Sequence, residues 1–296
     1  MTSWAVTLVA TKENQLANDQ VKKAQSLLGL DSQIIWLDEG RACDLIIPCE
    51  PVSKDELEEK LLTALANTDI AIQKNENRRK KLLVADMDST MIQLETLDYL
   101  AEILGFGEEV NEITARSMRG ELDFADSLRT RVALLKGQST DAMSKVLEDI
   151  PYTDGAEVTV KTMIKHGAYC ALVSGGFTFT TDIVGPKLGF NEARANVFEI
   201  EDNTLTGNVI DPILARDSKQ HTMEELCDKL DITSELACCI GDGANDLDMI
   251  QAAGMGVGFH GKPIVQEKAA FNIRFGDMTT LLYFQGYHKN EFVSVV

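Results

Sequence analysis

Four apolar residues lead directly into a pair of aspartates in the segment Leu82-Leu83-Val84-Ala85-Asp86-Met87-Asp88-Ser89-Thr90. A short uninterrupted apolar run bounded by polar residues is typical of a strand buried on both faces of a parallel sheet. Residues i and i+2 that leave a strand point to the same side, so Asp86 and Asp88 should face one site. On this segment alone, a pair of acidic loop residues without catalytic role remains an alternative.

Two further predicted strands also end in unusual polar sequence. Residues 168–173 are followed by Ser174-Gly175-Gly176, and residues 236–240 by Gly241-Asp242-Gly243-Ala244-Asn245-Asp246. Strands that alternate with helices predict a parallel, doubly wound α/β sheet, in which ligands bind beyond the carboxyl ends of the strands. All three polar segments should therefore meet at one edge of this sheet. That coincidence is stronger evidence for a site than any one segment.

The acidic residues at this edge suit phosphate chemistry. One carboxylate of the pair Asp86 and Asp88 can attack phosphorus, while the other, protonated, gives its proton to the leaving oxygen. Asp242 and Asp246 lie at the neighbouring strand end and, together with Asp86, would supply oxygen ligands to Mg2+. In a purely structural account Asp246 caps the following helix, but this explains one acidic residue and not the cluster.

Two other residues would help to hold a phosphate group. Ser174 precedes a predicted helix, so its hydroxyl and the backbone N–H groups that follow can bind phosphate oxygens. The ammonium group of Lys219 would offset phosphate charge. Taken singly, Ser174 is equally consistent with an ordinary turn and Lys219 with a surface lysine.

The composition excludes several other functions. The chain has 47 acidic and 28 basic residues, a net charge of -19, which disfavours nucleic acid or an anionic membrane as a partner. No apolar run approaches the roughly 18 residues of a membrane helix, and no secretory signal is evident near the N-terminus. We therefore expect a cytoplasmic protein. The four histidines and six cysteines show no metal-ligand spacing, which argues against zinc hydrolysis.

Residues 1–76 have a pattern of their own. Strands are expected at 4–10, 33–37, 44–48 and 69–73, with helices at 14–28 and 53–65, and this βαββαβ order predicts a ferredoxin-like module. It resembles the small amino-acid-binding regulatory domains fused to metabolic enzymes. A packing or dimerisation module without a ligand is the alternative, so a homodimer is left open. The polar run 75–81, which ends in four cations, is interpreted as a solvated linker.

The rest of the chain, residues 77–296, is expected to form the catalytic domain. The sequence from 94 to about 147 is helical almost throughout and interrupts the alternation of strands and helices. It should therefore form a separate helical cap, at about 92–150, inserted after the first strand of the sheet.

The order Asp-x-Asp, Ser, Lys, Gly-Asp-Gly-x-Asn-Asp resembles the haloacid dehalogenase superfamily. Segments 119–124, 127–132 and 173–177 are similar to those of the phosphoserine phosphatases in its helical-cap branch, and the resemblance runs from about 82 to 270. It implies hydrolysis of O-phospho-L-serine to serine and phosphate through an aspartyl-phosphate, the last step of serine biosynthesis. Residues 1–76 match only in general shape.

The resemblance also implies a role for each matching residue. Asp86 would form the aspartyl-phosphate, and Asp88 would act first as acid and then as base. Mg2+ would be held by Asp86, the backbone carbonyl of Asp88, and Asp242. The implied phosphate-binding residues are Ser174, Gly175, Lys219, Asn245 and Asp246, and the implied substrate-binding residues of the cap are Glu95 for the ammonium, Arg131 for the carboxylate, and Met118 and Phe124, which would close over the substrate.

Three alternatives remain at this point. The aspartyl-phosphate could pass its phosphoryl group to an amino-acid alcohol such as homoserine instead of water. The chain could also be a related small-molecule phosphomonoesterase whose cap serves another anion. From a different class, it could be mainly an amino-acid-sensing protein that acts through residues 1–76.

Overall fold

The computed structural model describes residues 3–118 and 121–295 and contains two β-sheets. The first sheet has the strand order β2-β3-β1-β4, and its neighbouring strands are antiparallel. This is the ferredoxin-like arrangement that the sequence predicts. Its elements are β1 (Trp4–Ala10), α1 (Asn18–Leu28), β2 (Gln33–Asp38), β3 (Ala42–Ile47), α2 (Lys54–Ala64) and β4 (Thr68–Lys74).

The second sheet has the order β11-β10-β9-β5-β6-β7-β8 and is parallel except for the antiparallel pair β7 and β8. The strand β5 lies near its centre and is buried on both faces, because Leu83 and Ala85 pack into one core and Leu82 and Val84 into another. The strands are β5 (Leu82–Ala85), β6 (Tyr169–Phe177), β7 (Glu192–Glu201), β8 (Thr204–Ile210), β9 (Ala237–Gly241), β10 (Met255–Phe259) and β11 (Phe271–Ile273).

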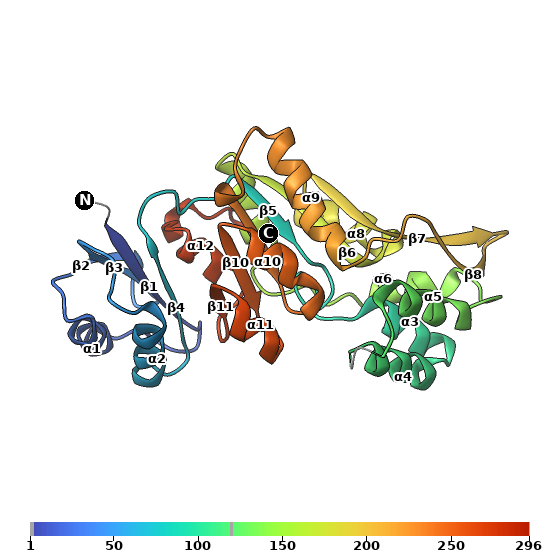
Figure 1. Cartoon of the computed structure of the whole chain (residues 1–296), viewed down its shortest axis with the longest axis horizontal. Helices are drawn as coiled ribbons and strands as arrows, with labels where there is room; N and C mark the ends of the chain where they lie inside the picture. The colour runs from blue at the N-terminus through green and yellow to red at the C-terminus, as the bar shows by residue number, and fades with distance from the viewer. Residues whose placement is uncertain (1–2, 119–120, 296) are drawn as a thin grey trace.

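Helices cover both faces of the second sheet, which confirms the doubly wound α/β fold (Figure 1). One face packs against α7 (Ala156–Lys165), α8 (Thr178–Leu188) and α12 (Thr280–Phe284), and the other against α9 (Arg216–Lys229), α10 (Leu247–Ala252) and α11 (Pro263–Lys268). The sequence analysis did not predict β11 or α12. They contain three and five residues, too few for a periodic pattern to stand out.

Four helices follow β5 before the alternation resumes. They have a hydrophobic core of their own, in which Leu128 and Val132 pack with Phe198, Leu205 and Val209 of the β7–β8 hairpin. In Figure 1 this group lies at the opposite end of the molecule from the first sheet. The helices are α3 (Thr96–Leu104), α4 (Gly107–Met118), α5 (Phe124–Leu134) and α6 (Asp141–Glu148).

The first sheet shares a core with the second. Val9 and Ala71 of the first sheet belong to the same buried cluster as Tyr283 and Phe284 of α12, all of them at most 1% exposed. The opposite face of the first sheet is covered by α1 and α2. Contact with the rest of the chain is therefore made through a hydrophobic face and not only through the connecting segment.

The connecting segment 75–81 is solvated only in part, and the prediction is wrong for two of its four cations, which are buried. Arg78 and Lys80 are 6% and 7% exposed. The guanidinium of Arg78 donates to both carboxylate oxygens of Asp44, at 2.7 and 3.0 Å, and to the carbonyl of Phe284. The ammonium of Lys80 donates to the carbonyls of Asn77 and Glu235, each at 2.9 Å. Buried acceptors replace water around these cations.

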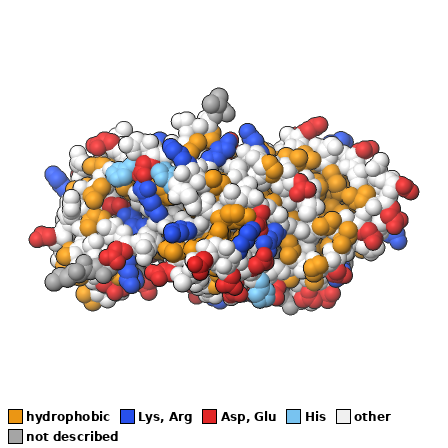
Figure 2. All heavy atoms as spheres, turned by 90° about the horizontal axis from the view of Figure 1, so that it is seen from above, with side chains coloured by type: hydrophobic (Ala, Val, Ile, Leu, Met, Phe, Trp, Pro, Cys, Tyr) orange, Lys and Arg blue, Asp and Glu red, His pale blue; other side chains and the backbone are white. Residues whose placement is uncertain are grey.

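The surface carries charges of both signs. On the face shown in Figure 2, basic and acidic side chains are interspersed, with hydrophobic side chains between them. Within residues 3–118 and 121–295, no helix combines the length and the apolar character that crossing a bilayer requires.

Arg78→Ala should destabilise the protein by about 3–5 kcal/mol, because it leaves the buried carboxylate of Asp44 without its counter-ion. Arg79→Ala is the matched control, since Arg79 is 42% exposed and pairs with Glu291 at the surface; it should cost at most about 1 kcal/mol. Urea unfolding measures both free energies. Equal losses for the two variants would contradict the role assigned to Arg78.

Candidate active site

Three strand ends meet where the sequence places them. Asp86 follows β5, Asp242 follows β9, and Ser174 and Gly175 lie near the C-terminal end of β6. The strand β5 is paired with both β6 and β9. They line one cavity of about 570 Å³ between the sheet edge and helices α3 to α5. The predicted site residues on its wall are Asp86, Asp88, Glu95, Phe124, Arg131, Ser174, Gly175, Asp242 and Asn245.

Three carboxylates converge at this edge of the sheet, and two of them, Asp86 and Asp242, line the cavity. Oxygen atoms of Asp86, Asp242 and Asp246 lie within 4.8 Å of one another, and the three residues are 5%, 7% and 0% exposed. Burial, and next the charge of Asp86, raise the pKa of both Asp242 and Asp246. A set of donors made only of carboxylate oxygens fits a hard divalent cation, whose charge would relieve this repulsion.

Lys219 supplies the positive charge beside the carboxylates. Its ammonium lies 2.7 Å from Oδ1 of Asp86 and 2.6 Å from Oδ1 of Asp246, and the side chain is buried in the first turn of α9. Burial alone would lower the pKa of Lys219, but the two carboxylates raise it, so the group stays protonated. Both Lys219 and Asp246 lie behind the cavity wall.

The two oxygens of Asp86 have different surroundings. Oδ1 accepts from the N–H of Met87 at 2.8 Å and from Lys219. Oδ2 makes no hydrogen bond to any residue of the described ranges. The carboxylate is thereby fixed in orientation while one oxygen remains free on the cavity side.

Asp88 is held by the cap. The hydroxyl of Thr96, the first residue of α3, donates to Oδ2 of Asp88 at 3.2 Å. Oδ1 is buried and has no hydrogen-bond partner among the described residues. Burial, followed by the charges of Glu95 and Asp86, raises the pKa of Asp88 well above its usual range. A carboxyl group in such surroundings retains a proton that it can donate.

The backbone after Val173 is closely approached by a side chain of the cap. The N–H of Gly176 donates to the hydroxyl of Ser174 at 2.9 Å, and the carbonyl of Gly175 accepts from the amide of Asn196 at 2.9 Å. A Cβ atom on Gly175 would lie 2.9 Å from Cζ of Phe124. A side chain at position 175 would therefore require the ring of Phe124 to shift.

The remaining cap residues present opposite charges to the cavity. Glu95 accepts from the hydroxyl of Ser89 at 2.7 Å. Arg131 lies 3.5 Å from Asp98 and donates to the hydroxyl of Thr114 at 3.4 Å. The fourth predicted cap residue, Met118, ends α4, and its side chain lies outside the described residues.

Sequence reasoning missed three residues of the cavity and its support. Thr96 orients Asp88; Asp98 pairs with Arg131; and the ammonium of Lys262 lies 3.3 Å from Oδ2 of Asp242. A signal existed for two of them. Asp98 lies one helical turn after Glu95, and Lys262 follows the end of β10 at the same edge of the sheet.

The family model of haloacid dehalogenase-like hydrolases matches residues 83–251, more than half of the chain. The chain belongs to this family. It is also similar to a phosphoserine phosphatase of Haemophilus influenzae, with 45% identity over 68% of this chain and 64% of that protein. The chain thus spans less than two thirds of that relative's length.

Two solved structures extend the likeness. A haloacid dehalogenase family hydrolase from Salmonella enterica serovar Typhi matches with a TM-score of 0.85 and 28% identity, covering 96% of this chain and 98% of its own. A phospho-aspartyl intermediate analogue of a phosphoserine phosphatase matches with a TM-score of 0.65 and 38% identity, covering 70% of this chain and 99% of its own. The first match includes both sheets.

Lys219→Met should destabilise the protein by about 3–5 kcal/mol at neutral pH, because Asp86 and Asp246 would remain buried without a cation. Lys187→Met, at a lysine of α8 that is 55% exposed, should change stability by about 0.5 kcal/mol or less. Thermal and urea unfolding report both effects. A Lys219→Met protein as stable as the control would refute the assigned electrostatic role.

Proposed function

We propose that the chain is a magnesium-dependent phosphatase that hydrolyses O-phospho-L-serine. The observation that carries this proposal is the juxtaposition of two carboxyl groups with different surroundings in one cavity: Asp86 is 2.7 Å from the ammonium of Lys219 and has one free oxygen, and Asp88 has a buried oxygen without a partner among the described residues. The likeness to phosphoserine phosphatases supports the choice of substrate.

In the first step a carboxylate oxygen of Asp86 attacks phosphorus. The bond from phosphorus to the seryl oxygen breaks, and Asp88 gives its proton to that oxygen, so serine leaves as a neutral alcohol. Ser174, through its hydroxyl and the N–H groups of its loop, would bind the phosphoryl oxygens, and the positive charge of Lys219, beside Asp86, would stabilise the negative charge of the group. The product of this step is an aspartyl-phosphate.

In the second step water attacks the phosphorus of the aspartyl-phosphate. Asp88, now a carboxylate, takes a proton from the water, the bond from phosphorus to the Asp86 oxygen breaks, and phosphate is released. Thr96 keeps Asp88 in the same position for both steps, since its hydroxyl is fixed at the start of α3. The enzyme returns to its starting protonation state.

Mg2+ would be held by the carboxylates of Asp86 and Asp242, with Asp246 close by, and by the backbone carbonyl of Asp88. When bound, the ion supplies positive charge that stabilises the phosphate oxygens and lessens the repulsion between carboxylates. The cluster of oxygen donors within 4.8 Å supports this assignment.

The cap supplies the groups that would recognise serine. The carboxylate of Glu95 suits an ammonium group and the guanidinium of Arg131 suits a carboxylate, and both face the cavity that holds Asp86. Asp98 and Thr114 position Arg131 from either side. Phe124 lies over the phosphate loop at Gly175.

Asp86→Asn should reduce phosphate release from phosphoserine by about 1,000-fold or more, because an amide is a poor nucleophile. Asp182→Asn, at an exposed position of α8, is the control and should retain activity. Removal of divalent cations with a chelator should abolish wild-type activity, and MgCl2 should restore it. Robust turnover by Asp86→Asn, or turnover unaffected by the chelator, would refute the mechanism.

Arg131→Ala should lower kcat/KM for phosphoserine by about 10- to 100-fold, through loss of a charge-assisted contact to the substrate carboxylate. Hydrolysis of p-nitrophenyl phosphate, which has no such carboxylate, should be nearly unchanged. Arg129→Ala is the control, because Arg129 lies on the same helix but is 47% exposed and pairs with Asp211. Parallel losses on both substrates would show that Arg131 serves structure and not specificity.

A further inference from the structure

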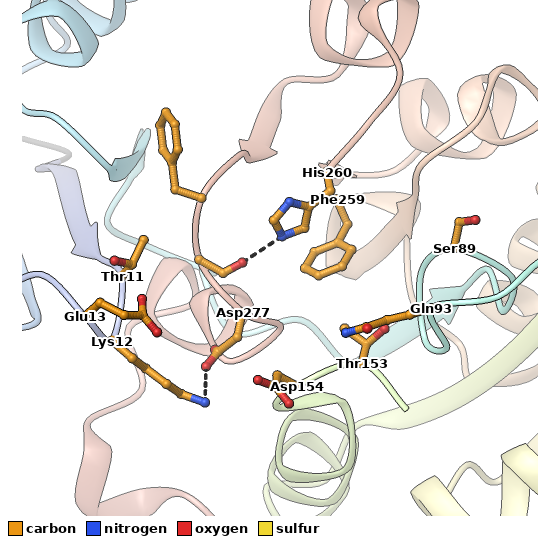
Figure 3. Close-up of a pocket in the computed structure, with 12 residues that line it drawn as sticks. Thr11, Lys12, Glu13, Ser89, Gln93, Thr153, Asp154, Phe259, His260 and Asp277 are labelled. Atoms are coloured by element: carbon orange, nitrogen blue, oxygen red, sulfur yellow. Dashed lines mark hydrogen bonds and ion pairs between the residues drawn. The ribbon is translucent and has the colours of Figure 1, made fainter. Parts of the chain in front are cut away.

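A second cavity, of about 480 Å³, lies between the first sheet and the loops of the second (Figure 3). Its walls come from residues 11–13 after β1, 275–277 after β11, 153–154 before α7, and the loop after β5 that follows the proposed nucleophile. None of the roles assigned above uses this space, except that Ser89 lines both cavities.

Four polar side chains on this wall, those of Gln93, Thr153, Glu13 and Asp154, lack partners among the described residues. The hydroxyl of Thr153 is buried, in a residue 6% exposed, and makes no hydrogen bond. The carboxylates of Glu13 and Asp154 likewise have no hydrogen bond or ion pair within residues 3–118 and 121–295. A buried hydroxyl without a partner is unusual in a native protein and indicates a missing donor or acceptor.

Two cations lie near the cavity and share one carboxylate. The ammonium of Lys12 lies 2.7 Å from Asp277, which is also 3.2 Å from the guanidinium of Arg41. Lys12 and Arg41 share the single carboxylate of Asp277, which leaves one positive charge, whereas Glu13 and Asp154 carry two negative charges; the formal charge around the cavity is therefore negative by one. Figure 3 shows Lys12 turned toward Asp277, with Asp154 on the adjoining side of the cavity.

Aromatic rings form the apolar part of the wall. The rings of Phe259 and His260 meet edge to face with centroids 4.4 Å apart, and Phe275 is 42% exposed. His260 donates from Nε2 to the carbonyl of Gly276 at 2.9 Å, which fixes its ring. Carboxylates beside aromatic faces attract an ammonium group that carries an apolar body.

The wall is also pre-formed. Asp69 of β4, which is fully buried, accepts from the N–H groups of Arg274, Phe275 and Gly276 at 2.7, 3.1 and 2.7 Å. This carboxylate fixes the loop after β11 against the first sheet. A site whose walls are already ordered requires little ordering when a ligand binds.

We propose that this cavity binds a small molecule that carries a primary ammonium group on an apolar body. Glu13 and Asp154 would receive the ammonium, Thr153 would hydrogen-bond to the ligand, and Phe259 and Phe275 would contact its apolar part. A free amine and an apolar amino acid share this chemistry, and the two are distinguished by the probes below.

Occupancy of the cavity would reach the active site through Ser89. This residue has a positive φ of 55°, which is strained for serine, and its hydroxyl holds the carboxylate of Glu95 at 2.7 Å. A ligand that contacts Ser89 would therefore change the position of Glu95. This second part rests on the proposed function, in which Glu95 binds the substrate ammonium; the binding site itself does not.

Binding is tested on the full chain without substrate, by calorimetry and by ligand-detected NMR. The probes are benzylamine, L-phenylalanine and benzyl alcohol, a neutral molecule of benzylamine's shape. Benzylamine, L-phenylalanine or both should bind at millimolar concentration, and benzyl alcohol should bind about fivefold or more weakly than the better probe. Preference for L-phenylalanine would identify the natural ligand as an amino acid, and preference for benzylamine as a free amine.

The double variant Glu13→Gln, Asp154→Asn should weaken binding of the charged probe by about fivefold or more. The control Asp31→Asn, Glu76→Gln alters two exposed acids outside the cavity and changes the net charge equally; it should leave binding unchanged. Failure of both charged probes to bind, equal binding of benzyl alcohol, or equal losses in the two double variants would overturn the site.

The coupling to Glu95 has its own readout. A saturating charged probe should change the KM of the wild type for phosphoserine by about threefold or more, and Ser89→Ala should still bind the probe but show no probe-dependent change in KM. A KM shift that persists in Ser89→Ala would overturn this route while leaving the binding site intact. Absence of any phosphatase activity would refute the proposed function and not the binding result.

Discussion

The rest of this structure depends on the electrostatic repulsion among three buried carboxylates that lie close together. Asp86, Asp242 and Asp246 could not remain charged together without a cation, because their mutual repulsion grows as water is removed. Lys219 supplies one positive charge from α9, and a divalent ion would supply more. The order of strands in the second sheet produces this cluster, because β5 and β9 are paired and their carboxyl ends lie side by side.

The cap completes what the sheet edge begins. The hydroxyl of Thr96 orients Asp88, and Phe124 covers the loop at Gly175. Both parts of the site therefore depend on side chains from the cap as well as on the second sheet. Glu95 and Arg131 come from the same group of helices. In the proposed function, substrate recognition and proton transfer would therefore both depend on this group of helices, whose core extends onto the β7–β8 hairpin. This arrangement lets specificity change without disturbing the carboxylate cluster.

The sequence predicted what depends on local pattern. Apolar runs predict the strands that precede Asp86, Ser174 and Asp242, and because parallel strands end at one edge of a sheet, the sequence also predicts that these residues lie together. The ferredoxin-like order of the first sheet was equally readable, because its strands and helices have clear periods. Element ends were less certain: α1 begins at Asn18 and not at residue 14.

What the sequence could not supply depends on partners distant along the chain. Four cations in a row are usually solvated, and nothing local indicates that Arg78 meets Asp44, 34 residues away. Thr96 is an ordinary first residue of a helix until the fold places Asp88 beside it. Glu95 and Arg131 required a family pattern, since charged residues on helices are common without a function. The division at residues 76 and 77 and the assigned roles remain predictions.

The core shared by the two sheets has a consequence for how the molecule loses its structure. Because Val9 and Ala71 pack with Tyr283 and Phe284, detaching the first sheet would expose large aromatic side chains to water. The first sheet and the body of the second should therefore melt as one cooperative unit, with a single calorimetric transition and one common set of slowly exchanging amides. The cap, with its separate core, is the part that can open locally while that unit stays intact.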